Sequence, residues 1–269
     1  MLIGSNEAYV KELSLLWKNV FGDEEGYINL FFESVYKKSK TFAHFEDGKI
    51  VSVLYLLCSD IKLSGEIFNG YYLYAAATDK SFRGRGLMGK LINEAKKYAE
   101  NSGKAFISLV PANEHLYNYY EKFGFKTAMY KSFDEINCVN KESSEFAETG
   151  AVSYLEKRNE AFENSFLWQK DELSYALKCF YYLGAKAYVT PFCGMICSCN
   201  EPLVYELVCK KDDYEKALSA VSSAVENKSV KVFSPYGNEK IAFGMVCPTD
   251  EKLKNKINEE QIYMNLALD

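Results

Sequence analysis

A short segment rich in glycine and arginine carries the clearest chemical signal in the sequence, Arg83-Gly84-Arg85-Gly86-Leu87-Met88-Gly89-Lys90. It follows an apolar run typical of a strand and opens a stretch with helical periodicity. Unpaired backbone N–H groups and the positive end of the helix dipole therefore converge on one point. The glycines let the backbone approach an anion closely, and the arginines add positive charge. The segment predicts a binding site for a phosphate or pyrophosphate group.

Two general nucleotide motifs overlap with this segment, and neither fits its surroundings. Gly84, Gly86 and Gly89 match the dinucleotide fingerprint, which expects an acidic residue about 20 positions later, at the end of the next strand. The apolar run at 105–110 has no acidic residue. The same glycines nearly match a P-loop, but Leu91 stands where Ser or Thr would hold Mg²⁺.

The elements around the segment follow from hydrophobic periodicity. Alternating apolar residues and turn signals predict an antiparallel meander before it, and a parallel strand after the helix that it opens. In chain order, the sequence predicts a helix ending at Gly22, a helix over 24–36, strands over 41–46, 50–63 and 67–78, a helix from Leu87 to Gly103, a strand over 105–110, a helix over 113–122 and a strand from Phe125.

The order of elements repeats in the second half of the chain. Residues 139–150 are polar and lack periodicity, which predicts a linker between a first domain over 1–138 and a second over 151–269. The second domain is predicted to contain helices over 151–163 and 169–183, strands over 185–190, 193–199 and 203–209, a helix over 214–225, and strands over 230–233 and 262–268. Its counterpart of the glycine segment is Lys210-Lys211-Asp212-Asp213, whose carboxylates would repel a pyrophosphate. We expect the second domain to lack a pyrophosphate loop.

A second motif gives the chain a family resemblance. Residues 113–125 read Asn-Glu-His-Leu-Tyr-Asn-Tyr-Tyr-Glu-Lys-Phe-Gly-Phe, with an Asn seven residues before a Tyr and then a Gly-Phe pair. Together with Arg83-x-x-Gly86, this order resembles the GCN5-related N-acetyltransferases (GNAT). The segment from Ala76 to Arg83 and the ending Tyr-Met-Asn-Leu-Ala-Leu-Asp further resemble Eis-type bacterial acetyltransferases, without their third C-terminal domain.

This resemblance implies a fold and a co-substrate. The fold is α/β (α+β), a GNAT fold with a mixed, mostly antiparallel sheet, a splayed parallel strand pair, and a second, degenerate GNAT-like half. Acetyl-CoA would bind in the cleft between the splayed strands, and no metal is expected. The residues implied in cofactor binding are Ala76, Ala77 and Thr78 for the pantetheine arm, Arg83, Gly84, Arg85, Gly86, Leu87, Met88 and Gly89 for the pyrophosphate, and Asn113 beside the cofactor.

Direct attack of an amine on the thioester leaves a thiolate that needs a proton, which a tyrosine can donate. Tyr120 occupies the matching position in the resemblance, and Tyr117 is the next candidate. The structural alternative for Tyr120 is packing beside Tyr119 and Phe123.

The group that deprotonates the amine is less clearly marked. No residue from 67 to 78 is acidic, so the strand carboxylate of some relatives is missing. The resemblance to Eis-type enzymes offers the carboxylate of Asp269 instead, while a frayed terminus or a water relay stay open. We expect His44 and His115 to be structural. Trp17, Phe31, Phe32 and Tyr36 could line the acceptor site or pack in the core.

Composition excludes several classes of partner. The 269 residues carry 32 Lys and Arg against 37 Asp and Glu, a net charge of −5, which argues against binding to nucleic acid or anionic membranes. The longest apolar run, near Ile50 to Cys58, is far below the roughly 20 residues of a membrane span. The eight cysteines, including Cys193, Cys197 and Cys199, are expected to be reduced thiols in a cytoplasmic protein.

The sequence thus predicts an acetyl-CoA-dependent N-acetyltransferase that acts on a primary amine, with Tyr120 as general acid and Asp269 as a further catalytic candidate. The acceptor would be a small molecule or peptide, and cationic. The alternative is a catalytically silent acyl-CoA-binding or regulatory module on the same fold. The missing strand carboxylate favours that alternative, and Tyr120 argues against it. The identity of the amine and the oligomeric state are left open.

Overall fold

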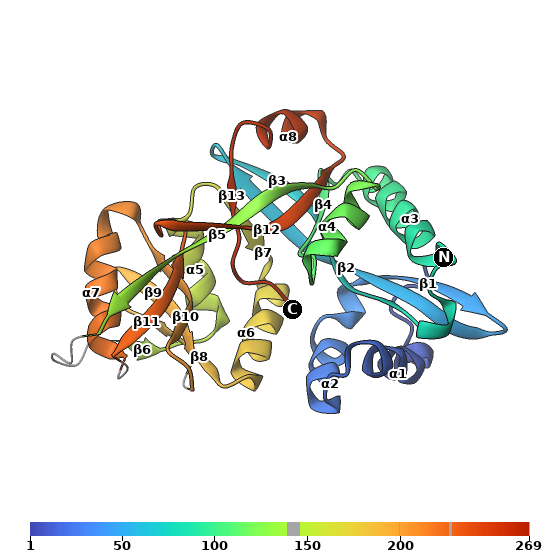
Figure 1. The fold of residues 1–269 in the computed structure, drawn as a ribbon, viewed down its shortest axis with the longest axis horizontal. Coiled ribbons are helices and arrows are strands. Elements are labelled where there is room, and N and C mark those ends of the chain that lie inside the picture. Colours follow the sequence, from blue (N-terminus) through green and yellow to red (C-terminus); the bar gives the residue numbers. More distant parts are fainter. Residues whose placement is uncertain (139–145, 199, 226–227, 269) are drawn as a thin grey trace.

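The strands pair into one mixed 13-stranded sheet in the computed structural model, which describes residues 1–138, 146–198, 200–225 and 228–268. The helices are α1 (Val10–Phe21), α2 (Glu25–Ser34), α3 (Leu87–Asn101), α4 (Glu114–Glu121), α5 (Ala151–Ala161), α6 (Lys170–Tyr182), α7 (Tyr214–Ala224) and α8 (Glu251–Lys256). The strands are β1 (Lys40–Glu46), β2 (Lys49–Leu63), β3 (Glu66–Thr78), β4 (Phe106–Leu109), β5 (Lys126–Asn137), β6 (Ala147–Glu148), β7 (Ser165–Trp168), β8 (Ala185–Val189), β9 (Cys193–Ser198), β10 (Leu203–Cys209), β11 (Ser229–Ser234), β12 (Glu239–Pro248) and β13 (Ile262–Tyr263). Figure 1 shows their arrangement.

The predicted meander is confirmed. β1 pairs antiparallel with β2, and β2 pairs antiparallel with β3. Gly48 and Gly65 in the two turns have φ values of 77° and 75°, a left-handed conformation that glycine adopts at little cost. β3 then pairs in parallel with β4, over residues 70–72 and 106–108 alone.

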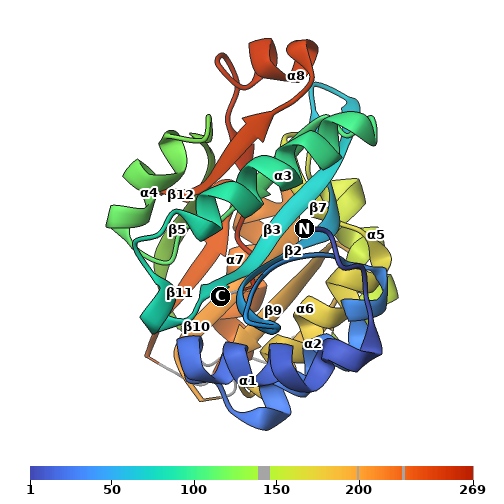
Figure 2. The same ribbon diagram turned by 90° about the vertical axis from the view of Figure 1, so that its right-hand side faces the viewer.

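Side-chain alternation along β2 and β3 places helices on both faces of this part of the sheet. Tyr55 and Tyr74 belong to the core cluster that contains the apolar residues of α1 and α2. Leu54 and Leu73 point to the opposite face and pack with residues of α3 and α4. Figure 2 shows α3 lying across β3, with α1 and α2 near the lower end of the sheet.

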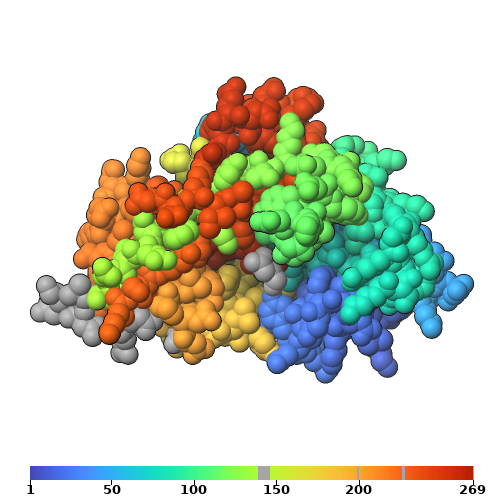
Figure 3. All heavy atoms as spheres, in the orientation of Figure 1, coloured from blue at the N-terminus to red at the C-terminus, as the bar shows by residue number. Residues whose placement is uncertain are grey.

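The two halves of the chain exchange strands. β12, from the second half, pairs antiparallel with both β4 and β5 of the first half. Residues 132–137 of β5 pair in turn with β11 of the second half. In Figure 3, red segments from the end of the chain lie beside the green residues of the first half and reach the orange second half. The predicted boundaries, 1–138 and 151–269, stay a prediction, and residues 139–145 of the predicted linker lie outside the described residues.

The sequence analysis does not predict β7, β12 or α8. The last strand that it does predict is longer than the strand in the structure. The strand predicted over 262–268 ends at Tyr263. Residues 264–268 continue without regular structure, held by a 2.7 Å hydrogen bond from the Trp168 indole Nε1 to the Leu266 carbonyl. Leu266 and Leu268 are buried, so the apolar character of this run reflects core packing and not strand pairing.

The second half contains a buried ion pair. Arg158 of α5 donates to both carboxylate oxygens of Glu206 on β10, at 2.9 and 3.1 Å. The Tyr154 hydroxyl donates to the same carboxylate at 3.0 Å. Both charged side chains are almost completely buried, so this group fixes α5 on the sheet.

The cysteines within the described residues are free thiols, and four of them are buried. Cys193 and Cys197 have free thiols on β9, and Cys199 lies outside the described residues. Across the described part of the chain, no cluster of His, Cys, Asp and Glu could hold a metal ion. No helix of the described residues is long and apolar enough to span a membrane.

Candidate active site

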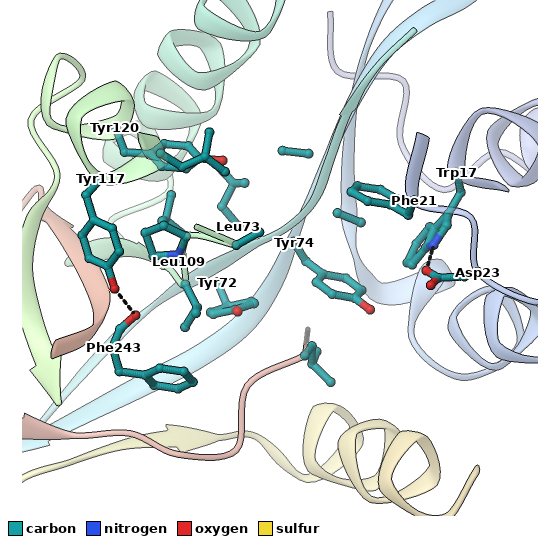
Figure 4. A pocket seen from close by; sticks show the side chains of 17 residues that line it. Trp17, Phe21, Asp23, Tyr72, Leu73, Tyr74, Leu109, Tyr117, Tyr120 and Phe243 are labelled. Atoms are coloured by element: carbon teal, nitrogen blue, oxygen red, sulfur yellow. Dashed lines mark hydrogen bonds between the residues drawn. The ribbon is translucent and has the colours of Figure 1, made fainter. Parts of the chain in front are cut away.

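A cavity of about 450 Å³ opens where β3 and β4 separate. The two strands pair as far as Tyr72 and Ser108, and the residues that follow on each strand line the cavity. The predicted splayed pair of parallel strands is therefore confirmed. Figure 4 shows the cavity between α4 on one side and the connection from α1 to α2 on the other.

A bulge in β3 directs the strand into the cavity. Tyr55 pairs with Tyr74, but Val53 pairs with Ala77, so β3 holds one extra residue at this point. Ala75 takes up the distortion with a φ of 45°, an uncommon conformation for a residue other than glycine. Such local strain is concentrated at functional sites, and Ala75 lines the cavity.

The lining residues divide between the two faces of the sheet. Tyr72 and Tyr74 belong to the core on the face of α1 and α2. Leu73 and Tyr120 belong to the core on the face of α3 and α4. The cavity therefore connects the two faces through the gap between β3 and β4.

The glycine segment leads into the N-terminal end of α3. Gly84 and Gly86 have φ values of 78° and 73°, and no atom lies within 4 Å of a Cβ built on either of them. Gly86 is the N-cap of α3, whose first turn holds no acidic residue. The backbone amides of this turn have no partner within the helix. The segment thus presents open backbone and a positive helix end to solvent, as an anion site requires.

Two tyrosines of α4 reach the cavity with different partners. The Tyr117 hydroxyl donates a 2.9 Å hydrogen bond to the Phe243 carbonyl on β12, so its proton is engaged. The Tyr120 ring is 7% exposed and packs against Phe125 and Tyr119. Burial, and then the neighbouring Tyr119, raise the pKa of Tyr120 to about 12. Its hydroxyl stays protonated at neutral pH and can act only as a proton donor there.

A single carboxylate faces the cavity from the opposite side, among the described residues. Asp23 follows α1 and is held by a 2.7 Å hydrogen bond from the Trp17 indole Nε1 to its Oδ2. Gly22 makes this placement possible, because it ends α1 with a φ of 84° and turns the chain back over the helix. The Asp23 side chain thus lines the cavity in a fixed position.

The first half of the chain matches the model of a known protein family. A family model described as "Acetyltransferase (GNAT) domain" matches residues 4–128, which contain the meander, the glycine segment and α4. Residues 4–128 therefore contain a GNAT acetyltransferase domain. No curated protein sequence matches it significantly.

Solved GNAT structures have the same fold over nearly the whole chain. A GCN5-related N-acetyltransferase from Kribbella flavida has a TM-score of 0.73 at 15% identity, covering 93% of this chain and 72% of that one. Eis1 from Mycobacterium abscessus has a TM-score of 0.70 at 10% identity, covering 94% of this chain and 74% of that one. A tandem GNAT protein from the clavulanic acid biosynthesis pathway has a TM-score of 0.55 at 10% identity, covering 93% and 98%. The predicted GNAT fold with a second GNAT-like half is confirmed.

The residues predicted to bind the cofactor differ in their surroundings. Ala76 lines the cavity, whereas Ala77 is buried and its carbonyl accepts a 3.2 Å hydrogen bond from Ser52. The Thr78 carbonyl accepts a 3.1 Å hydrogen bond from Arg83 Nε, which braces the start of the glycine segment. Arg85 is exposed and lies over the Phe82 ring.

The helical end of the glycine segment is more involved in packing. A Cβ on Gly89 would lie 2.9 Å from the Phe123 ring, so this glycine allows α3 to approach the end of α4 closely. Leu87 is buried, and Met88 packs against the same core. These side chains anchor the helix, which leaves only their backbone amides for an anion.

The remaining residues singled out from the sequence lie at different places relative to the cavity. Asn113 is the exposed N-cap of α4. His115 is exposed on α4, and His44 on β1 lies 3.3 Å from Glu46, so neither lines the cavity. Trp17 lines it, whereas Phe31, Phe32 and Tyr36 pack in the core. Asp269 lies outside the described residues.

Asp23 and Phe243 line the cavity but are not identified by the sequence analysis. Asp23 stands in a loop, and only the return of that loop over α1 brings it near β3. Phe243 belongs to β12, which reaches the cavity through strand exchange. A carboxylate directly after a helix-ending Gly22 was the available signal for Asp23, but such residues are frequent at helix ends.

Proposed function

We propose that this GNAT protein is an acetyl-CoA-dependent N-acetyltransferase that acetylates a primary amine by direct attack in a ternary complex. The observation that supports this proposal most directly is the cavity that connects both faces of the sheet. The glycine segment and Tyr120 lie on one face, and Asp23 lies on the other. Two substrates could meet there from opposite sides, each with a suitable polar group. Such positioning is the main source of rate in a reaction between two bound molecules.

The cofactor side fits a CoA molecule in its chemistry. Gly84 and Gly86 leave open backbone where a diphosphate would lie, and Arg83 and Arg85 add positive charge. The pantetheine arm would run along the end of β3 at Ala76, in the gap that β4 leaves. Bound acetyl-CoA supplies an activated acetyl group as a thioester.

Side chains of the protein donate and accept the protons that the reaction transfers. The amine nitrogen forms a bond to the acetyl carbon while the carbon–sulfur bond breaks. Tyr120 gives its proton to the leaving sulfur, and the acetylated nitrogen then releases a proton that restores the Tyr120 hydroxyl, directly or through water. We assign to Asp23 the binding of the ammonium group and the removal of its proton, directly or through water, since no residue from 67 to 78 is acidic.

The proposed cofactor site can be tested by measuring acetyl-CoA binding to the wild type and to Gly86→Glu by calorimetry. A glutamate there places a negative charge in the diphosphate site, and we expect at least about a hundredfold weaker binding. Gly48→Glu is the matched control, because Gly48 has a similar φ of 77° with equally open surroundings in a distant turn. Equal loss in both variants, or no binding by folded wild type, would refute the assignment.

A transfer assay then separates an enzyme from a silent acyl-CoA-binding module. An enzyme should release CoA from acetyl-CoA when a primary amine is present. Tyr120→Phe should lose this release but still bind acetyl-CoA. Tight acetyl-CoA binding without release for any amine supports the silent module.

A further inference from the structure

The second half of the chain repeats the arrangement that forms the first cavity. β8, β9 and β10 form an antiparallel meander, and β10 then pairs in parallel with β11 over residues 203–204 and 231–232. β1, β2 and β3 precede the parallel pairing of β3 with β4 in the same order. A cavity of about 370 Å³ lies beyond this second parallel pair as well, lined by Lys211 after β10 and by Pro235 and Tyr236 after β11. We call it the second-half cavity.

A carboxylate enters each cavity from an equivalent position. α1 packs on β2 and β3, and α5 packs on β9 and β10. Asp23 stands two residues after Phe21, the last residue of α1, and Glu163 stands two residues after Ala161, the last residue of α5. Asp23 lines the first cavity, and Glu163 lines the second-half cavity. Among the described residues the two cavities share no lining residue, so they are separate places on the molecule.

The surroundings of the second-half cavity do not suit a CoA molecule. The segment over 210–213 contains no glycine, and it ends in Asp212 and Asp213. Asp213 is the N-cap of α7, and Glu215 follows in the first turn of that helix. These carboxylates occupy the helix end that would otherwise attract a diphosphate. A ligand of this cavity is therefore a smaller molecule, and the volume lies within the range of about 300–1,000 Å³ of small-molecule sites.

Exposed side chains of both charges line the second-half cavity. They are Lys211, Lys240 and Glu163, from three different segments of the chain. The Lys240 Nζ lies 4.7 Å from the ring centroid of Tyr130, which is itself a lining residue, so this ammonium group stands at the wall. A ligand that carries a cation and an anion close together matches this set of charges, because each charged end finds an opposite charge.

The deeper part of the second-half cavity is aromatic. Phe162, Ile262 and Tyr263 line it and are buried. The rings of Phe162 and Tyr263 meet edge to face, with their centroids 5.2 Å apart. The buried Tyr263 hydroxyl has no hydrogen-bond partner among the described residues, which is unfavourable unless a polar molecule satisfies it. Such walls accept an aromatic ring that carries polar groups at one end.

We propose that the second half binds a free α-amino acid with an aromatic side chain, at a site separate from that of acetyl transfer. Lys211 and Lys240 bind its carboxylate, and Glu163 binds its ammonium group. Its ring lies against Phe162 and Tyr263. An α-amino acid presents both charges on one carbon atom and directs its side chain away from them, as the charged mouth and the aromatic interior require.

Calorimetry of the whole protein with L-phenylalanine tests the proposal, and it involves no acetyl transfer. The matched probe is 3-phenylpropanoate, which has the same ring and carboxylate but no ammonium group. We expect L-phenylalanine to bind and 3-phenylpropanoate to bind at least about tenfold more weakly, as follows from the loss of a charged hydrogen bond. Equal binding of the two probes would show an anion site only and would overturn the proposal. Absence of L-phenylalanine binding to the folded protein would overturn it as well.

Substitutions of exposed residues place the ligand in one of the two cavities. Glu163→Gln and Lys240→Gln should each weaken L-phenylalanine binding at least about tenfold. Glu160→Gln on α5 and Lys210→Gln are the matched controls, because both residues are exposed and neither lines the second-half cavity. The controls and Asp23→Asn should stay within about twofold of wild type. Equal losses in the controls, or a loss in Asp23→Asn alone, contradict the proposal, whereas failure of the transfer assay bears only on the proposed reaction.

Discussion

Removal of a single oxygen atom, in Tyr120→Phe, should slow acetyl transfer while leaving the protein folded. The ring contacts with Tyr119 at 5.3 Å and Phe125 at 5.7 Å remain in the variant. No hydrogen bond of the hydroxyl to another described residue accounts for its raised pKa, so little stability is lost with it. We expect the free energy of unfolding to change by less than about 1 kcal/mol.

The kinetic effect should be much larger than this change in stability. A positioned general acid contributes about 10²- to 10⁴-fold in rate, which corresponds to about 2.7 to 5.5 kcal/mol in activation free energy. The pKa of about 12 adds a pH signature, because the functional form of Tyr120 is the protonated one. The rate of the wild type should therefore rise as the amine loses its proton and show no fall below about pH 10.

Steady-state CoA release from pH 6 to 10, with acetyl-CoA affinity measured in parallel, provides the assay. Tyr119→Phe is the matched control, because it removes the same atom from the preceding residue of α4, which does not line the cavity. We expect this control to keep kcat within about twofold of wild type. If Tyr120→Phe retains more than about half of kcat, or both variants lose activity equally, Tyr120 is not the general acid.

Three further predictions concern stability. Gly70→Ala should cost about 1–3 kcal/mol in chemical denaturation, because its Cβ would lie 2.5 Å from the Phe106 ring where β3 meets β4; an unchanged midpoint would contradict this. Glu206→Gln should cost about 3–5 kcal/mol, since it leaves the buried Arg158 without its countercharge, and a loss below 1 kcal/mol would show that water reaches the pair. Burial raises the pKa of Glu172, so its ionisation destabilises the fold as pH rises through that pKa. Glu172→Gln should therefore raise the free energy of unfolding more at pH 7 than at pH 4. An equal gain at both pH values would refute the argument.

The sequence alone determined the features that depend on local physical chemistry. Gly84 and Gly86 adopt left-handed backbone because no side chain opposes it, and an apolar stripe makes the following residues a helix. The turns at Gly48 and Gly65 fix the meander in the same way. The resemblance of residues 113–125 to the second GNAT motif pointed to Tyr120, and this motif is local because it lies on α4 and its flanks.

Only the tertiary structure decided what lies opposite these elements. Phe243 reaches the cavity because β12 pairs with β4 across more than 100 residues of chain, and such pairing leaves no local pattern. Asp23 faces the cavity because Gly22 reverses the chain and Trp17 holds the carboxylate. Periodicity could not separate a strand from buried coil at 264–268, because both alternatives bury the same apolar residues. The proposed cofactor side of the site is thus largely local in origin, and the proposed acceptor side is set by contacts between distant segments.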